Sequence, residues 1–435
     1  MTAGKFKKTV LSNGACLITE KQAYSKAFCF GAWILKGTRN EPETLSGVSH
    51  FLEHLVFKGT KRRTSFEIAS ALENLGGDLN AYTTKEYSCY HALALKEHHV
   101  EAVDVICDLI TGMSISEKDF ELEKKVILQE MAMSADNYED LAHEIFFDLV
   151  YEGHPLARRI LGTEKSIDSM KKMDVVSYYN EIYAPENFIF SASGCVDHQD
   201  LEKQIEKYFA KADLKKRFKQ NPSMNSGKRF RAEVGPPEWK LIRQVLERPT
   251  EQVQIVLGFP VPTFRDHHRF ESFILNAYLG GGMTSSLFQS VREKTGLVYN
   301  IQSSLNTHKD CGCLMIYAST EAKNVKKVVS LISAELNKVK RNGISKEFIR
   351  RLKTQICGQI LLGSDDVENR MSSLGINEMV FGEYRPVERV IEEINNVTQK
   401  TMDDFIKTKM NLDEISGVLV GSGVNKMKGW WKNAF

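Results

Sequence analysis

Residues 47–59, GVSHFLEHLVFKG, place two histidines and a glutamate on neighbouring turns of a predicted helix. The apolar residues of this segment recur at spacings of three and four, which is the period of an amphipathic helix (Val48, Phe51, Leu52, Leu55 and Val56). Ser46 is suited to cap the start of the helix and Gly59 to end it. Residues four apart lie on one face of a helix, so His50 and His54 project side by side.

Two imidazoles on neighbouring turns can ligate one zinc ion, with nitrogen-to-metal distances of about 2.0 to 2.1 Å. Glu53, which precedes His54, is then free to act as a base toward a water that the metal activates. The order His-x-x-Glu-His reverses the commoner His-Glu-x-x-His and occurs among catalytic zinc motifs. The same residues also fit an amphipathic helix with two histidines at its polar edge and no metal. A third ligand from another segment is therefore needed to favour the zinc site over this alternative.

The best candidate for a third ligand lies in residues 116–131, SEKDFELEKKVILQEM. Ser116 and Asp119 form a capping-box start, and apolar residues follow at helical spacing. Glu123 and Glu130, seven residues apart, share a face of this helix. One of them can ligate a metal while the other orients a ligand through a hydrogen bond. The residue types leave open which glutamate ligates the metal and which orients a ligand. Both glutamates also fit ordinary solvated carboxylates on a helix.

Three segments carry a resemblance to a known family: residues 7–14 (KKTVLSNG), 50–60 (HFLEHLVFKGT) and 80–86 (NAYTTKE). They resemble the pitrilysin-type (inverzincin) metallopeptidases of family M16, in the branch of mitochondrial processing peptidase and its short bacterial relatives, and the resemblance covers nearly the whole chain. In that family the third zinc ligand is a glutamate 76 positions after the second histidine, which is Glu130 here. The family's supporting glutamate lies seven positions earlier, at Glu123. The resemblance thus implies one zinc ion per chain, held by His50, His54 and Glu130.

Length, composition and net charge indicate a multidomain protein and give no sign of nucleic-acid binding. At 435 residues the chain is long enough for two or three domains. Its 58 basic and 56 acidic residues give a net charge of +2, so no overall field argues for nucleic acid as a partner. No run of 18 apolar residues and no secretion signal occurs, so we expect no membrane span and a bacterial cytoplasmic location. The eight cysteines are scattered, without Cys-x-x-Cys pairs, and are expected to be mostly buried thiols.

The chain reads as two halves joined by a basic linker. Residues 214–232 contain seven basic residues and no acid, and they include the turn-rich stretch 221–227, NPSMNSG. Such a stretch cannot bury a core, which predicts a zinc-binding domain at residues 1–213, a linker at 214–234 and a second domain at 235–435. Each half ends in a helix followed by a strand that a glycine closes, which suggests a duplication (175–194 and 402–423).

Strand-like runs such as 87–95 and 313–319 alternate with helical stretches along both halves. This pattern predicts an α+β fold of two homologous layered domains, each an antiparallel-rich sheet flanked by helices. The resemblance implies the same fold. The second half contains no His-x-x-Glu-His, so only the first half is expected to bind metal.

The second half has its own distinctive segment, residues 280–299, which reads GGGMTSSLFQSVREKTGLVY. It satisfies neither Gly-x-x-x-x-Gly-Lys nor Gly-x-Gly-x-x-Gly, so we expect no nucleotide and assign the glycines to close packing. In relatives, an Arg and a Tyr seven apart in this segment hold the substrate backbone and the developing oxyanion opposite the zinc. Arg292 and Tyr299 match that spacing, with an exposed Arg and a packed Tyr as the alternative.

The resemblance also bears on assembly and on substrate. In short-chain members the Arg/Tyr pair completes the zinc site of a second subunit. This chain carries both the zinc ligands and the Arg/Tyr pair, which implies a homodimer. A heterodimer of related subunits is the alternative. Asn80, Ala81 and Tyr82 resemble the edge strand on which an extended peptide adds beside the zinc. Asp140 and Glu144 match acidic positions that receive an arginine near the scissile bond, although an exposed acid pair fits them as well.

The expected function is a zinc endopeptidase for unfolded or short polypeptides, with a preference for basic residues near the cut. Besides the metal ligands, its parts are Glu53 for proton transfer and the Arg292/Tyr299 pair for the tetrahedral intermediate. The alternative is a catalytically silent scaffold of the same fold, as in the core subunits of the respiratory cytochrome bc1 complex. The intact inverted motif with both downstream glutamates argues against that alternative.

Overall fold

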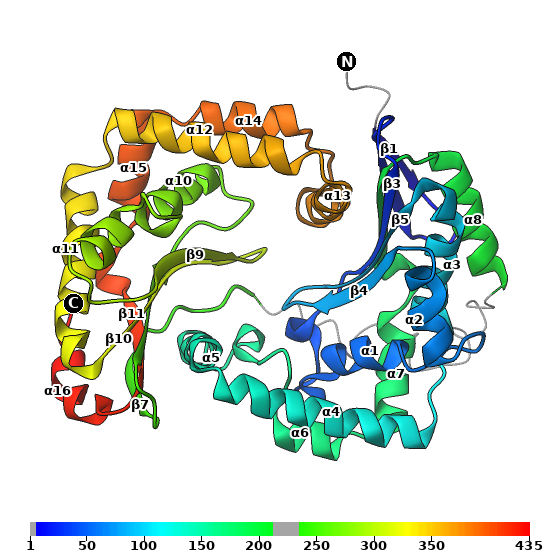
Figure 1. Cartoon of the computed structure of the whole chain (residues 1–435), viewed down its shortest axis with the longest axis horizontal. Helices are drawn as coiled ribbons and strands as arrows, with labels where there is room; N and C mark the ends of the chain where they lie inside the picture. The colour runs from blue at the N-terminus through cyan, green and yellow to red at the C-terminus, as the bar shows by residue number, and fades with distance from the viewer. Residues whose placement is uncertain (1–5, 212–234) are drawn as a thin grey trace. The chain divides into compact units, whose positions relative to one another are not determined.

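The computed structural model describes residues 6–211 and 235–435. They form two compact units that interleave along the chain, so neither unit is one continuous stretch. The first unit draws on Met1–Ala132, Arg158–Glu233 and Leu362–Arg385, and the second on Met133–Ala157, Val234–Leu361 and Pro386–Phe435. Each unit is built around one β-sheet with helices on both faces (Figure 1).

The first unit contains a six-stranded sheet in the order β1-β2-β6-β3-β5-β4. Its strands are β1 (Phe6–Val10), β2 (Cys16–Lys21), β3 (Ala27–Ile34), β4 (Asp78–Thr83), β5 (Ser88–Leu95) and β6 (Phe188–Gly194). β2 and β6 run parallel, and all other neighbours run antiparallel. The strands β3 and β6 are buried along almost their whole length, because helices cover the sheet on both faces.

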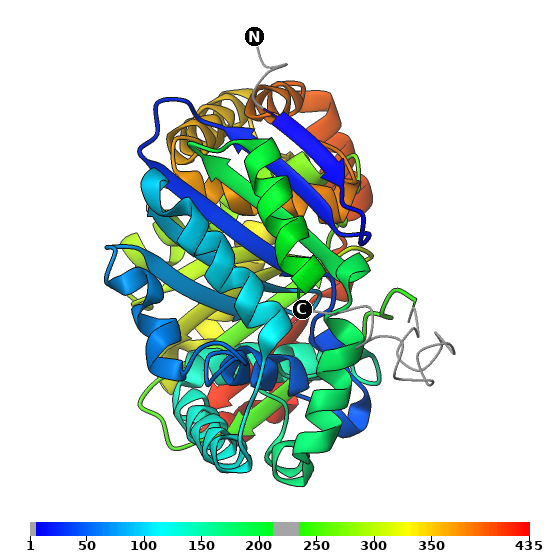
Figure 2. The ribbon, with the colours of Figure 1, turned by 90° about the vertical axis from the view of Figure 1, so that its right-hand side faces the viewer.

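Seven helices contribute to one hydrophobic core with the first face of this sheet. They are α1 (Val48–Val56), α2 (Ser65–Glu73), α3 (His99–Gly112), α4 (Glu117–Asp136), α6 (Glu164–Ser169), α7 (Lys172–Ile182) and α8 (His198–Lys211). Figure 2 views the unit from the side of this helical layer, with the green helix α8 in front of the blue strands. The short 3₁₀ turns of the unit are η1 (Thr38–Asn40), η2 (Glu43–Leu45), η3 (Lys96–His98) and η5 (Pro185–Asn187).

The opposite face of the first sheet is covered by α13 (Val367–Phe381), which comes from the second half of the sequence. Apolar residues of the helix and the sheet share one cluster (Ile18, Cys29, Trp33, Met371 and Leu374). The helix lies so close that a Cβ added to Gly375 would stand 2.2 Å from Cε2 of Trp33. A buried ion pair between Arg370 and Glu20 adds a polar anchor, with Nε 3.1 Å from Oε1.

The second unit contains a five-stranded sheet in the order β7-β11-β8-β10-β9. Its strands are β7 (Arg243–Glu247), β8 (Val253–Pro260), β9 (Ile301–Thr307), β10 (Gly312–Thr320) and β11 (Ser416–Gly421). β7 and β11 run parallel, and the other pairs run antiparallel.

Helices again cover both faces of this sheet. One face and its helices form a single core, and the helices are α10 (Arg269–Gly280), α11 (Val325–Asn342), α12 (Lys346–Gly363), α14 (Val387–Asn395), α15 (Gln399–Lys409) and α16 (Lys428–Trp431). The other face is covered by α5 (Tyr138–Val150), whose Phe146 and Val150 share a cluster with Val256 and Met315. The short turns are η4 (Pro155–Ala157), the π-helix η7 (Phe288–Glu293), η8 (Ala322–Asn324), η9 (Leu412–Glu414) and η10 (Val424–Met427).

The two sheets have the same strand order once β1 is set aside. β2-β6-β3-β5-β4 correspond position by position to β7-β11-β8-β10-β9, with the parallel pair at the same place. The predicted helix–strand endings are α7 with β6 and α15 with β11, and the strands close on Gly194 and Gly421, both with positive φ. The predicted α+β class is confirmed, and the predicted duplication is visible in the topology.

The compact units differ from the two predicted halves in the segments 133–157 and 362–385. Each sheet would expose an apolar face if only its own half of the sequence covered it. Helix α5 from the first half covers the second sheet, and α13 from the second half covers the first. The linker predicted at 214–234 lies outside the described residues.

Two expectations from composition can also be compared with the structure. All eight cysteines are free; four are buried and four are half-buried. Within residues 6–211 and 235–435, no helix is both long and apolar enough to cross a membrane.

Candidate metal centre

The helix that carries both histidines, α1, begins in a way that the sequence did not predict. Ser46 does not cap it; the N-cap is Gly47, with φ of 92° and no capping side chain. The first backbone N–H groups donate instead to the carboxylate of Glu41. Gly47 N–H lies 2.7 Å from Oε2, and Ser49 N–H lies 2.7 Å from Oε1. A buried carboxylate from outside the helix therefore performs the capping role that we expected of Ser46.

The other predicted helix ends are partly right. Helix α1 ends at Val56, before Gly59, which forms an isolated bridge with Thr64 instead. The start of α4 follows the prediction, because Ser116 Oγ accepts a hydrogen bond from Asp119 N–H at 3.0 Å. Helix α4 then continues to Asp136, so that both predicted glutamates lie on it.

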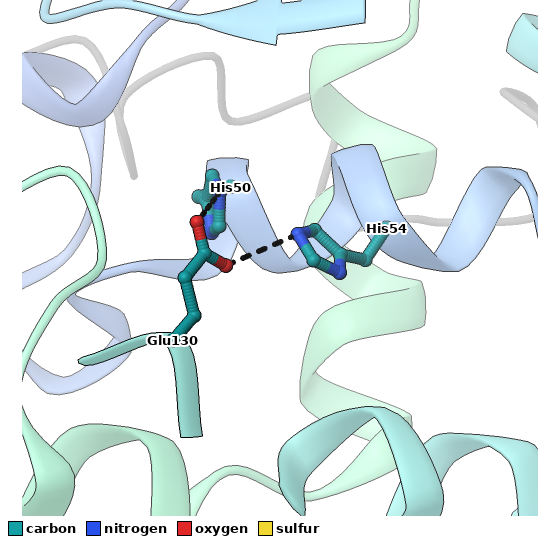
Figure 3. Close-up of side chains that lie close together, drawn as sticks. All are labelled: His50, His54 and Glu130. Atoms are coloured by element: carbon teal, nitrogen blue, oxygen red, sulfur yellow. Dashed lines mark ion pairs between the residues drawn. The ribbon is translucent and has the colours of Figure 1, made fainter. Parts of the chain in front are cut away.

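Three side chains from α1 and α4 converge, as Figure 3 shows. Glu130 Oε1 lies 3.8 Å from His50 Nε2, and its Oε2 lies 3.5 Å from His54 Nε2. One ligand atom of each residue lies within 4.8 Å of the other two. The two imidazole rings are 4.7 Å apart between centroids, as expected for neighbours on one helix face.

This geometry fits a small tetrahedral cation. Ligand atoms at about 2.0 to 2.2 Å from one zinc ion stand roughly 3.3 to 3.6 Å apart, close to the separations of Glu130 from the two imidazoles. Two histidines and one carboxylate are also a ligand set of catalytic zinc sites, which keep a fourth position open. In the described part of the chain, this is the one group of three or more His, Cys, Asp or Glu side chains that can hold a metal.

The electrostatic environment of His50 favours metal binding. Burial, and then the neighbouring His54, lower the pKa of His50 to about 4. The imidazole is therefore neutral at physiological pH, and a metal does not have to displace a proton from it. Its Nδ1 is buried and has no hydrogen-bond partner among the described residues, so packing rather than a second hydrogen bond holds the ring.

Glu123 lies behind His54 and not among the ligand atoms. Its Oε2 lies 3.3 Å from His54 Nδ1, and its Oε1 lies 2.8 Å from Lys58 Nζ. The Glu123 side chain is 2% exposed, against 43% for Glu130. This contact directs Nε2 of His54 toward Glu130, and Lys58 balances the buried charge. Lys58 was not predicted as a site residue, although its position four residues after His54, on the same face of the predicted helix, was a signal.

Glu53 lies beside the cluster with a different partner. Its Oε2 accepts a hydrogen bond from Thr83 Oγ1 at 2.6 Å. Burial raises the pKa of Glu53, while the Thr83 bond and His54 oppose that rise. A carboxylate whose pKa lies above its ordinary value is a stronger base than an ordinary carboxylate, which suits proton transfer. Thr83 was not predicted as a site residue, because only the fold brings the end of β4 to α1.

The strand β4, which contains Asn80, Ala81 and Tyr82, is an edge of the first sheet. It pairs with β5 on one side, and no described strand lies on the other. Ala81 packs toward the core that contains α1, whereas Tyr82 packs on the opposite face with Trp33. An added peptide strand would therefore meet mainly the backbone of β4 on its open side.

Arg292 and Tyr299, the predicted pair of the second unit, lie close together. The Arg292 guanidinium carbon is 5.1 Å from the centroid of the Tyr299 ring, and Tyr299 is 77% exposed. Arg292 lies on the π-helix η7, a conformation often found at functional positions. The predicted close packing of the preceding glycines holds at Gly280, where an added Cβ would stand 2.2 Å from Ser303 N.

Asp140 and Glu144 both lie on α5, one helical turn apart. Asp140 is exposed and accepts a hydrogen bond from Asn137 Nδ2 at 2.6 Å, which makes it part of the helix start. Glu144 is half-buried. These two acids and the Arg292/Tyr299 pair belong to the second unit, while the metal cluster belongs to the first.

With fold and site in place, comparisons with known proteins identify the family. The family model described as Insulinase (Peptidase family M16) matches residues 16–164, and that described as Peptidase M16 inactive domain matches residues 169–356. The first match contains the whole His-His-Glu cluster. This chain belongs to peptidase family M16.

Curated relatives and solved structures agree with that assignment. An uncharacterized zinc protease of Streptomyces coelicolor is 35% identical over 396 residues, which is 91% of this chain and 85% of the relative. An uncharacterized zinc protease of Bacillus subtilis is 31% identical over 417 residues, which is 96% of this chain and 98% of the relative. The crystal structure of a Helicobacter pylori protease shares the fold, with a TM-score of 0.84, 20% identity, and coverage of 96% of this chain and 99% of that one.

Proposed function

We propose that this chain is a zinc-dependent endopeptidase that acts on unfolded or short polypeptides. The observation that carries the proposal is the convergence of His50, His54 and Glu130, with Glu53 beside them on α1. Three protein ligands leave one position of a tetrahedral zinc ion open, which distinguishes a catalytic site from a closed structural site. The family membership and the relatives named as zinc proteases support the proposal.

A zinc ion bound here would acidify a water molecule and polarise the peptide carbonyl group. Glu53 takes a proton from the attacking water and delivers it to the leaving amine. The raised pKa of Glu53 supports the first step, because a higher pKa makes the carboxylate a stronger base toward the water. Glu123 and Lys58 keep Nε2 of His54 directed at the ligand cluster.

The Arg292/Tyr299 pair supplies the electrostatic part of the reaction. A guanidinium and an exposed phenol that lie together offer several donors to one oxyanion, and such donors act where charge develops in the transition state. We place this pair at the metal centre of a second copy of the chain, which makes the active form a homodimer with two composite sites.

Substrate binding uses the open edge of β4 as a template for an extended peptide. Main-chain pairing accepts many sequences, which suits a peptidase for unfolded chains. Asp140 and Glu144 supply the added preference for arginine near the cut, because two carboxylates one helical turn apart can share one guanidinium. The intact ligand cluster is the reason for preferring an active enzyme over a silent scaffold of the same fold.

The proposal is tested by incubating the purified full-length chain with zinc and a peptide library, and reading the cut sites by mass spectrometry. Cutting is expected with zinc, should stop when a chelator removes the metal, and should return when zinc is restored. A zinc-loaded chain that cuts no peptide would favour the scaffold alternative. A chain that binds no zinc would contradict the metal centre itself.

A further inference from the structure

Glu41 is a buried carboxylate that is neither one of the three candidate metal ligands nor hydrogen-bonded to any of them. It is 4% exposed, and it precedes α1 by seven residues. Both of its carboxylate oxygens accept hydrogen bonds from backbone N–H groups at the start of α1, each at 2.7 Å. The guanidinium of Arg158 donates to the backbone carbonyl of Glu41, which holds the residue from its other side.

The helix that Glu41 caps is the helix that carries both metal-binding histidines. The N-terminus of an α-helix carries a positive partial charge, whose effect is strongest within the first turn. His50 is the third residue of α1 and so lies in that first turn. A divalent cation at His50 would therefore meet an unfavourable potential from its own helix, unless a negative charge cancels it.

A neutral cap would satisfy the same N–H groups without placing a charge there. Ser46 is adjacent to the helix and of a type suited to capping, yet its side chain does not cap α1. Its backbone carbonyl accepts a hydrogen bond from Ser166 Oγ at 2.7 Å. A buried carboxylate is costlier than a neutral cap, and burial raises the pKa of Glu41 to about 7 against the opposing bonds from Ser49 and Gly47. The charge at the helix start stabilises the helix dipole of the metal-free chain, and it also attracts a cation bound at His50.

We propose that Glu41 is a positioning residue that raises the metal affinity of the His50, His54 and Glu130 centre, through its negative charge at the start of α1. This inference rests on the proposed metal centre and extends it to a residue that touches neither metal nor substrate. The gain in affinity follows from the charge, which acts in addition to the two hydrogen bonds of the cap.

The test compares the zinc affinity of the wild-type chain and Glu41→Gln at pH 8, above the Glu41 pKa of about 7, by competition with a fluorescent chelator. The amide keeps the size and one acceptor oxygen but removes the charge and the second acceptor, so zinc is expected to bind about tenfold more weakly. Co²⁺ in place of zinc reports ligand geometry, and its visible absorption spectrum should be the same in both proteins. The metal-free melting temperature is expected to fall by no more than the loss of one capping hydrogen bond explains.

Two controls make the result specific. Glu67 caps the start of α2 with its carboxylate, 2.8 Å from Thr64 N–H, on a helix without metal ligands, so Glu67→Gln should leave zinc affinity unchanged. Thr44 is exposed just before α1, so Thr44→Lys should weaken zinc binding and Thr44→Glu should strengthen it, each by a few-fold. If Glu41→Gln does not fold, the difference in zinc affinity between the two Thr44 variants tests the proposal.

The outcomes separate this inference from the proposed function. If the wild-type chain binds no zinc, the proposed function fails first. If it binds zinc with the same affinity as Glu41→Gln, or with no difference between the two Thr44 variants, Glu41 has no charge role. A changed Co²⁺ spectrum in Glu41→Gln, together with equal zinc affinities of the two Thr44 variants, would assign Glu41 to structural capping alone and overturn the proposal.

Discussion

Three glutamates around the candidate metal centre differ in their surroundings, and each difference supports the role that we propose for that residue. Glu130 is 43% exposed and faces Nε2 of both histidines, which suits a ligand. Glu123 is 2% exposed and is held between His54 and Lys58, which suits a partner of a ligand. Glu53 has a raised pKa and a hydroxyl donor, which suits proton transfer. Residue types alone left the choice between Glu123 and Glu130 open, because only the fold shows what each one faces.

Replacing Glu53 by glutamine is expected to separate metal binding from catalysis. The amide cannot accept a proton from water, so turnover should fall by several orders of magnitude, while zinc stays near one ion per chain. His50→Ala, by contrast, should lose both zinc and activity. Metal analysis together with a peptide-cleavage assay checks both variants. Loss of zinc from Glu53→Gln, or its full activity, would contradict the assigned role.

Glu41 is expected to make the metal-free chain less stable as the pH rises. Its pKa is raised from 4.5 to about 7 in the folded state, so the folded state holds the proton more tightly than the unfolded one. The contribution to stability is complete below about pH 4.5 and is lost as the pH rises through 7. By pH 8 the loss amounts to roughly 3 kcal/mol of unfolding free energy.

Denaturant unfolding of the metal-free chain at several values between pH 5 and pH 8 measures this effect. Glu41→Gln has no carboxyl group to ionise there, so the difference in stability between variant and wild type should grow in the variant's favour as the pH rises. A constant difference across this range would show that Glu41 is not protonated in the folded chain at low pH. The pH dependence from His50 is shared by both proteins and cancels in the comparison.

At the scale of elements, the periodicity of the apolar residues predicted where helices lie along the chain. It did not predict which sheet each helix covers. Helices α1 and α4 and the strands β5 and β10 lie where spacing and alternation place them. The exchange of α5 and α13 between the sheets was not predictable, because an apolar stripe indicates that a helix is covered but not by which sheet. Likewise the cap from Glu41 has no local sequence signal, since the carboxylate reaches α1 only after the chain turns.

The docking of α13 on the first sheet can be tested at Gly375. An added methyl group would stand 2.2 Å from Trp33 Cε2, so Gly375→Ala should cost about 1 to 3 kcal/mol of unfolding free energy through overpacking. Gly358 is the matched control on α12, because nothing lies within 4 Å of an added Cβ there. Gly358→Ala should raise stability slightly, by up to about 1 kcal/mol. Equal effects of the two substitutions on denaturant unfolding would contradict the packing described here.

The acidic face of α5 is expected to set the preference for arginine. Replacing Asp140 by Asn and Glu144 by Gln should weaken the preference for arginine near the cut by about 1 to 3 kcal/mol, because two charge-assisted hydrogen bonds are lost. Cleavage of peptides without arginine should change little. Glu139→Gln, on the same helix, is the control and should keep the preference. An unchanged cut-site profile in the double variant would remove these acids from the specificity.

At the scale of the whole molecule, one sheet architecture occurs twice, and we propose a different role for each copy. The strand orders match, yet the His-His-Glu cluster lies in the first unit and the Arg292/Tyr299 pair in the second. The duplication was predictable from the matching ends of the two halves. The homodimer in which the pair would meet the metal centre was expected only from the resemblance, because assembly does not follow from local sequence pattern.

Mixing two inactive variants tests whether the sites are shared between subunits. Glu53→Gln chains and Tyr299→Phe chains should each be nearly inactive alone, since one lacks the base and the other the phenol. In a mixed dimer, one site combines the intact Glu53 of one chain with the intact Tyr299 of the other. Random re-association makes half the dimers mixed with one working site each, so about a quarter of wild-type activity per subunit is expected. No recovery, once subunit exchange is demonstrated with labelled chains, would mean that Tyr299 acts within its own chain or not at all.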